Sequence, residues 1–404
     1  MKTGIAVFAY NRSGHLQQVL DGLQKNRNVD KLYMFQDGLK CEAHRREWEK
    51  VRDVIKNITW CEVQSSFAEE NRGLADSIVE GINHVLAEND AVIVLEDDCV
   101  PAPDFIDFME QCFKKYQNSK RIYSVSGYSY PFHIRESSES DVYFCGRISS
   151  WGWGTWKDRW ENYEQDYGML QRMKKDKEKS LCLALWGRDL EEMLADRVRG
   201  NNDSWAVFWA LKVIEEGGLC VNPCDSLIQN IGLDGSGVHC GKSDFFDVRL
   251  CPKKHEGFLL PDNTEITPET EEAFAPLYGS YTALTYRQKK DRCSALIYGV
   301  GSLFLVNEKR INDDYDIVAF VDRNKKGYYA GKKILLPDEI KDYEFDKLVI
   351  MIRDEGEAGR VAEDMTDRYG IPEEKIESGT ARYTLWESHS YKPLGEGRTL
   401  SDKV

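Results

Sequence analysis

Short apolar runs alternate with helical patterns through the first hundred residues. Apolar side chains that recur every three or four positions predict amphipathic helices, and the β-rich runs between them have the length of buried strands. The expected strands are GIAVFAY at 4–10, KLYMFQD at 31–37, CEVQSS at 61–66 and AVIVLEDD at 91–98. The expected helices contain Leu16, Val19, Leu20 and Leu23, then Trp48, Val51 and Ile55, then Ile78, Ile82 and Val85. Successive βα units of this kind predict a parallel, doubly wound sheet.

The pattern changes twice further along the chain. Mixed helices and strands are expected from Pro101 to about Asp247, and residues 252–286 are rich in Pro, Glu and Thr with little periodicity. A fresh strand at 294–302, a helix and two more strands then predict a smaller βαβ domain. We therefore expect an α/β chain with a doubly wound domain at 1–255, a linker at 256–290 and a Rossmann-like nucleotide-binding or interaction domain at 291–404.

Composition and charge limit the kinds of partner and the cellular location expected for this protein. The formal net charge of −15 argues against nucleic acid, which needs a basic face. The 11 cysteines are scattered without a CxxC pair, so a disulfide framework or zinc ribbon is not expected. No leader pattern or membrane-length apolar run occurs, which favours a cytoplasmic protein. A broken basic stretch at 172–179 could contact anionic lipid weakly at the inner membrane face, although a solvated helix face explains it better.

Polar residues cluster where the first four predicted strands end. Tyr10-Asn11-Arg12 follows the first, Asp37 the second and Asn71 the third, while Glu96, Asp97 and Asp98 end the fourth. In a doubly wound sheet, ligands bind beyond these carboxyl ends. Three adjacent carboxylates repel one another unless a cation joins them, and Mg²⁺ or Mn²⁺ prefers such oxygen ligands. A solvated acidic turn is the alternative.

The segments FAYNR, LEDD, PAPDF and RISSWGWGTWKDRW resemble the GT-A glycosyltransferases of bacterial family 2 and, more distantly, animal N-acetylglucosaminyltransferase I. The resemblance covers roughly the first 250 residues. It implies that Asp98 holds the metal, and that Glu96 and Asp97 face the ribose and sugar of a nucleotide-sugar donor. It also implies that Arg12 approaches the phosphates, and that Asp37 and Asn71 contact a uracil base.

Three further features carry candidate chemistry. Trp151 and Trp153 flank Gly152 in a tryptophan-dense segment and could form a wall for a sugar ring, although core packing explains most of these rings. Asp203 precedes an expected helix that it could cap, and the resemblance makes it the catalytic base, with Asp158 and Asp104 as alternatives. His239, in the glycine-rich 231–241 segment, is a second metal ligand by resemblance or an exposed loop residue.

These features predict an inverting, metal-dependent glycosyltransferase. The expected donor is a UDP-sugar, by default UDP-N-acetylglucosamine, and the expected acceptor is a glycan or lipid-linked oligosaccharide of surface polysaccharide synthesis. A sugar-nucleotide pyrophosphorylase is one alternative, although YNRSGHL at 10–16 lacks the long Gly- and Arg-rich phosphate loop. A non-catalytic carbohydrate- or nucleotide-binding scaffold is another. In the second domain, YGVGS at 298–302 is an incomplete dinucleotide motif without a following Tyr-x-x-x-Lys, so a binding or interaction role is expected.

Overall fold

The computed structural model describes residues 1–132, 140–234, 246–250, 257–286 and 292–383. The chain forms two compact units. The first contains Met1–Tyr167 and Leu190–Ala273, and the second contains Gly168–Asp189 and the described residues from Phe274 onward. The predicted fold class, a doubly wound α/β domain and a smaller Rossmann-like α/β domain, is confirmed by the sheet of each unit.

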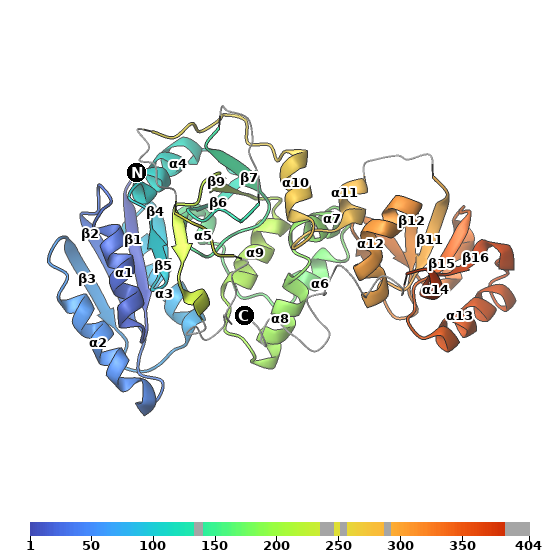
Figure 1. Cartoon of the computed structure of the whole chain (residues 1–404), viewed down its shortest axis with the longest axis horizontal. Helices are drawn as coiled ribbons and strands as arrows, with labels where there is room; N and C mark the ends of the chain where they lie inside the picture. Colours follow the sequence, from blue (N-terminus) through green and yellow to red (C-terminus); the bar gives the residue numbers. More distant parts are fainter. Residues whose placement is uncertain (133–139, 235–245, 251–256, 287–291, 384–404) are drawn as a thin grey trace. The chain divides into compact units, whose positions relative to one another are not determined.

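Within the described residues, the first unit is built on an eight-stranded mixed sheet in the order β3-β2-β1-β4-β8-β6-β9-β7. Figure 1 shows β3, β2 and β1 side by side in the blue part of the chain. The strands are β1 Thr3–Ala9, β2 Lys31–Gln36, β3 Glu62–Phe67, β4 Ala91–Glu96, β6 Ile122–Ser126, β7 Val142–Cys145, β8 Trp153–Trp156 and β9 Leu219–Pro223. The four strands predicted at the N-terminus form one continuous parallel block, β3-β2-β1-β4. Their carboxyl ends therefore meet at one edge, as the βα alternation predicts.

Helices connect and cover these strands. The apolar stripes Leu16–Leu23 and Ile78–Val85 are buried, as their helical spacing predicts. The helices of this unit are α1 Ser13–Leu23, α2 Arg45–Lys56, α3 Leu74–Glu88, α4 Phe105–Tyr116, α5 Lys157–Trp160, α8 Leu190–Arg199 and α9 Ala206–Glu215, and α10 Pro268–Phe274 ends at the first residue of the second unit. A short antiparallel ribbon joins β5 Cys99–Pro101 to β10 Ile228–Asn230. This ribbon places residues after β10 directly against the end of β4.

The antiparallel strand β8 enters the sheet between β4 and β6. Its second residue, Gly154, has no room for a side chain: an added Cβ would lie 2.5 Å from the Val92 carbonyl oxygen and 2.6 Å from the Phe113 ring. Glycine therefore lets β8 pack closely while the neighbouring indoles of Trp153 and Trp156 are buried.

The second unit has its own sheet, which is six-stranded within the described residues and runs in the order β13-β14-β12-β11-β15-β16. Its strands are β11 Ser294–Tyr298, β12 Asp316–Val321, β13 Gly327–Tyr329, β14 Lys332–Leu335, β15 Lys347–Ile350 and β16 Ile376–Ser378. Its helices are α6 Met169–Met173, α7 Lys177–Trp186, α11 Tyr281–Thr285, α12 Ser302–Asp314, α13 Glu355–Asp367 and α14 Gly379–Tyr383. Among the six strands that the structure describes here, β13 alone runs antiparallel to its neighbour.

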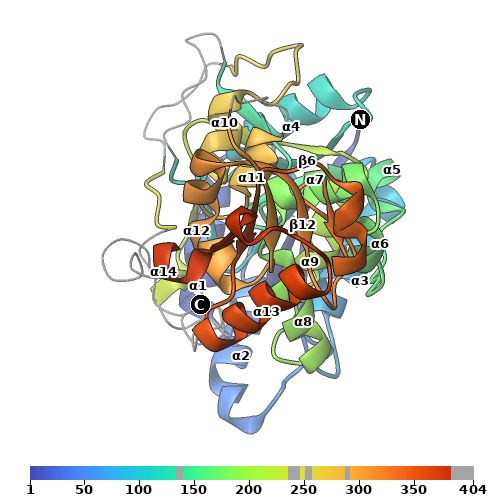
Figure 2. The same cartoon turned by 90° about the vertical axis from the view of Figure 1, so that its right-hand side faces the viewer.

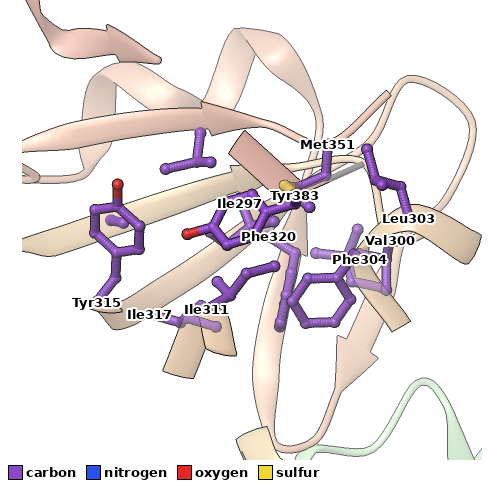
Figure 3. Close-up of a cluster of buried hydrophobic side chains, with 13 residues drawn as sticks. Ile297, Val300, Leu303, Phe304, Ile311, Tyr315, Ile317, Phe320, Met351 and Tyr383 are labelled. Carbon is purple, nitrogen blue, oxygen red and sulfur yellow. The ribbon is translucent and has the colours of Figure 1, made fainter. Parts of the chain in front are cut away.

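Two hydrophobic layers hold this second sheet. One face packs against α12, whose Phe304 meets the Phe320 ring with 5.2 Å between centroids, close to Tyr383 and Met351 (Figure 3). The other face packs against α13 through Val361 and its neighbours, and α12, β12 and α13 can be followed in Figure 2. The unit therefore has a core of its own.

Residues 257–286, the described part of the segment rich in Pro, Glu and Thr, carry more regular structure than its composition predicts. The short helices α10 and α11 lie there, and α11 begins where the Ser280 side chain accepts a hydrogen bond from the Ala283 amide. Among the described residues, none of the helices combines the length and apolar composition that a bilayer crossing requires.

Candidate active site

The acidic triplet Glu96, Asp97 and Asp98 lies at the end of β4, next to the end of β1, where Phe8 pairs with Glu96. Asp97 is 4% exposed, and the Asp98 side chain is 14% exposed. Burial, followed by repulsion from Asp98 and Asp97, raises the pKa of Glu96 to about 8. Burial also raises the pKa of Asp97. Burial and mutual repulsion thus oppose ionisation of the triplet, and a cation beside it would favour the ionised form.

Arg12 supplies one such cation from the protein itself. It lies between β1 and α1, and its Nη2 contacts Asp97 Oδ1 and lies 2.9 Å from Asp98 Oδ2. Burial alone would lower the pKa of Arg12, but the two carboxylates raise it. The structure thus brings together three residues that the sequence placed at different strand ends.

The backbone after β10 covers this ion pair. The Ile231 amide donates to the Asp98 carbonyl oxygen at 2.9 Å, and the Asn230 side chain accepts from the Gly232 amide at 2.8 Å. A Cβ on Gly232 would lie 2.3 Å from Asp98 Oδ2 and 3.0 Å from Arg12 Nη1. Sequence reasoning missed the contacts of Asn230 and Gly232, because only the β5–β10 pairing brings them to the triplet.

Gly232→Ala should therefore disturb the site without unfolding the protein. The added methyl group must displace Asp98 or Arg12, and a misplacement of about 1 Å can cost roughly 10²-fold in rate. Steady-state turnover and thermal unfolding of Gly232→Ala would be compared with Gly14→Ala, whose Cβ meets nothing within 4 Å. Equal turnover in the two variants would show that the 230–232 backbone does not shape the site.

Asp37, expected to contact a base, organises the 71–73 loop. Its carboxylate accepts four hydrogen bonds, from the backbone amides of Gly38, Arg72 and Gly73 and from the Asn71 side chain, at 2.8–3.0 Å. Asn71 also donates to the Gly38 carbonyl oxygen. Asp37 and Asn71 are thus brought together, with Asn71 exposed to solvent.

Tyr10 connects this region to the acidic triplet. Its amide donates to Asp97 at 3.3 Å, and its carbonyl oxygen accepts from the buried Gln36 side chain at 3.2 Å. Its hydroxyl lies 2.9 Å from His44 Nδ1 and accepts from the Lys40 amide at 2.9 Å. Gln36 and His44 are a further part of this edge that sequence reasoning did not single out.

Asp203 does not cap the helix that follows it, as the sequence suggested it could. Helix α9 starts at Ala206 with no side-chain cap, and Asp203 Oδ2 instead accepts from the Ala75 amide in the first turn of α3, at 3.2 Å. The other oxygen pairs with Arg197. Gly73, with φ of 85°, leaves room for this carboxylate, since a Cβ there would lie 2.5 Å from Asp203 Oδ2. Asp203 therefore lies beside the 71–73 loop and keeps acceptor sites available, with a third of its side chain exposed.

The other candidates lie apart from these contacts. Trp153 is fully buried and stacks on Trp205 with 5.0 Å between ring centroids, whereas Trp151 is half-buried and meets Tyr128 edge to face at 4.7 Å. Asp158 pairs with Lys120 and Arg159, and Asp104 is buried at the start of α4. His239 lies outside the described residues.

The triplet fits a divalent cation that is completed by substrate oxygens. In the parts of the chain that the structure describes, no three His, Cys, Asp or Glu side chains form a metal site by themselves. Mg²⁺, however, is commonly bound through one or two carboxylates together with substrate phosphates and water. Such a cation would offset the burial and mutual repulsion that raise the pKa values of Glu96 and Asp97.

Comparison with known proteins gives distant likenesses. A family described as C2185-like, N-terminal matches residues 291–377, which lie in the second unit. No curated protein matches the chain. Among solved structures, the mannosyltransferase PcManGT from Pyrobaculum calidifontis, in complex with GDP-Man and Mn²⁺, is similar with 14% identity and a TM-score of 0.29. That match covers 43% of this chain and 46% of the mannosyltransferase, so it spans less than half of either.

Two further structures are similar at the same level. HddC from Yersinia pseudotuberculosis shares 12% identity at a TM-score of 0.28, over 41% of this chain and 81% of that one. A197 from STIV shares 15% identity at a TM-score of 0.25, over 41% of this chain and 71% of that one. Likenesses this distant do not assign an activity to the chain.

Proposed function

We propose that the first unit is a glycosyltransferase that moves a sugar from a nucleoside diphosphate donor to a hydroxyl group, with Mn²⁺ or Mg²⁺ as cofactor. The observation that carries this proposal is the meeting of Arg12 with Asp97 and Asp98 at the carboxyl ends of β1 and β4. The acids suit a hard cation. Together, such a cation and the neighbouring guanidinium can bind a diphosphate from two sides. The sequence resemblance to GT-A enzymes supports the same reaction.

The donor is proposed to lie across the carboxyl ends of β1 and β4. Arg12 would bind its diphosphate, Asp98 would hold the cation, and Glu96 and Asp97 would face the ribose and sugar. The 71–73 loop would contact a uracil base, with Asn71 presenting its side-chain oxygen, since its amide nitrogen already donates to Asp37 and Gly38. Because the Asp37 carboxylate already accepts four hydrogen bonds, we assign its contribution to base binding chiefly to the shape of this loop.

Transfer is proposed to proceed by a single inverting displacement. The acceptor oxygen attacks the anomeric carbon as the bond from that carbon to the diphosphate oxygen breaks, and Asp203 takes the hydroxyl proton. When bound, the divalent cation would neutralise charge on the leaving diphosphate. The half-buried Trp151 would support the acceptor or donor sugar ring. We further propose a UDP-sugar, by default UDP-N-acetylglucosamine, and a glycan or lipid-linked acceptor at the cytoplasmic face of a membrane.

Thermal unfolding with a nucleotide panel tests the binding part of this proposal. UDP at about 100 times its dissociation constant stabilises a protein by about 2.7 kcal/mol, or roughly 5–10 °C for a domain of this size. We expect this shift with UDP and Mn²⁺ together and a much smaller one with either alone. A shift with nucleoside triphosphate and sugar 1-phosphate, but not with UDP, would instead favour a pyrophosphorylase.

A further inference from the structure

The contacts of Arg12 affect the order in which the divalent cation and the nucleotide donor bind. The guanidinium and the cation assigned to Asp98 would compete for one carboxylate, whose Oδ2 lies 2.9 Å from Arg12 Nη2. Mg²⁺ binds a carboxylate oxygen at about 2.0–2.1 Å, closer than the guanidinium nitrogen lies to Oδ2. Two cations at one carboxylate repel each other and share its charge, so each weakens the binding of the other.

The surroundings of the ion pair favour the guanidinium while no ligand is bound. The side chains of Arg12, Asp97 and Asp98 are 20%, 5% and 14% exposed, so solvent screens their attraction weakly. The Gly232 backbone lies close to the pair, since an added Cβ would come within 2.3 Å of Asp98 Oδ2 and 3.0 Å of Arg12 Nη1. A cation arriving alone at Asp98 would displace Arg12 from that carboxylate and leave the guanidinium with Asp97 as its remaining acidic partner of the triplet.

A diphosphate changes this balance, because it offers the guanidinium a second set of anionic oxygens. Arg12 extends from the segment between β1 and α1 and makes no capping bond to α1, so its long side chain can turn from carboxylate to phosphate. We propose that Arg12 is an internal counter-ion that keeps the acidic triplet closed to divalent cations until a nucleoside diphosphate takes up its guanidinium. This inference rests on the proposed function of the site and adds that cation and donor bind cooperatively.

Mn²⁺ affinity in the absence of nucleotide gives the most direct readout. Titration calorimetry or Mn²⁺ spectroscopy on the full chain should show weak binding to wild type, tightened by UDP within the 5- to 150-fold range of ordinary coupling. Arg12→Gln should bind Mn²⁺ alone at least about fivefold more tightly than wild type, bind UDP more weakly, and lose most of the coupling. Arg27→Gln, which removes an exposed arginine from the same unit, controls for net charge and should behave as wild type.

Unchanged or weaker Mn²⁺ binding by Arg12→Gln, without nucleotide, would overturn the proposal. If this variant is unfolded without ligand, Mn²⁺ alone should restore its folding, and the Arg12→Lys variant should give an intermediate Mn²⁺ affinity. The proposal would also be overturned if Mn²⁺ did not restore folding of Arg12→Gln and Arg12→Lys bound Mn²⁺ no more tightly than wild type. Failure of wild type to bind UDP under any condition would contradict the proposed donor, whereas the metal-only comparison would still decide the role of Arg12.

Discussion

Asp98→Asn should lower sugar transfer by about 10³-fold or more while leaving the fold intact. The substitution keeps the size of the side chain but removes the charge assigned to cation binding, and charge stabilisation by a bound metal is worth several kcal/mol. At about 1.36 kcal/mol for each factor of ten, 4 kcal/mol corresponds to this loss. The measurement is transfer rate at saturating Mn²⁺, with thermal unfolding in parallel.

Stability should change little in this variant. Asp98 repels Glu96 and Asp97, so neutralising it relieves repulsion while Arg12 keeps its contact with Asp97. Asp21→Asn, on the exposed surface of α1, is the matched control and should retain full activity. Near-normal turnover by Asp98→Asn would remove this residue from the metal site.

Asp203→Asn should lower the transfer rate by about 10²- to 10⁴-fold, the usual effect of losing a positioned general base. An asparagine keeps a side-chain oxygen that can accept from the Ala75 amide, so the start of α3 should remain capped. The ion pair with Arg197 is lost, but Asp203 is a third exposed, and such pairs contribute at most about 1 kcal/mol. Donor affinity should stay close to that of wild type.

Rate and donor affinity must be measured on the same preparation. A variant that binds donor normally and transfers at more than about a tenth of the wild-type rate would contradict the assignment of Asp203, because that is a smaller loss than general-base catalysis supplies. The alternatives from the sequence, Asp158 and Asp104, are less suited. Asp158 is already paired with two cations, and Asp104 is buried.

Sequence patterns predicted the strands β3-β2-β1-β4 of the first sheet well, because β1, β2 and β4 are largely buried and the helices between the strands have clear apolar stripes, although β3 itself is partly exposed. The acids after β4 and the arginine after β1 were predictable for the same reason, since parallel strands bring their ends together. The insertion of β8 between β4 and β6 was not predicted. It depends on the close fit of Gly154 against Val92 and Phe113, which local periodicity does not encode.

Contacts between segments far apart in the chain also could not be predicted from the sequence. Asp203 caps a helix that starts far earlier in the chain, and nothing near residue 203 indicates that partner. The same is true of Gly232, which reads as part of a glycine-rich loop until the β5–β10 ribbon places it on Asp98. The strand ends were thus predictable, whereas the residues that cover them required the three-dimensional structure.

Release of UDP from UDP-sugars tests the central claim most directly. The full chain would be incubated with a panel of UDP-sugars and glycan or lipid-linked acceptors, with Mn²⁺ or with a chelator, and both UDP and glycosylated product would be measured. The proposal predicts that at least one donor yields UDP and product in equal amounts, only when the metal is present, and that Asp98→Asn abolishes both. Exchange of pyrophosphate into a nucleotide sugar, or donor binding without any turnover across the panel, would contradict it.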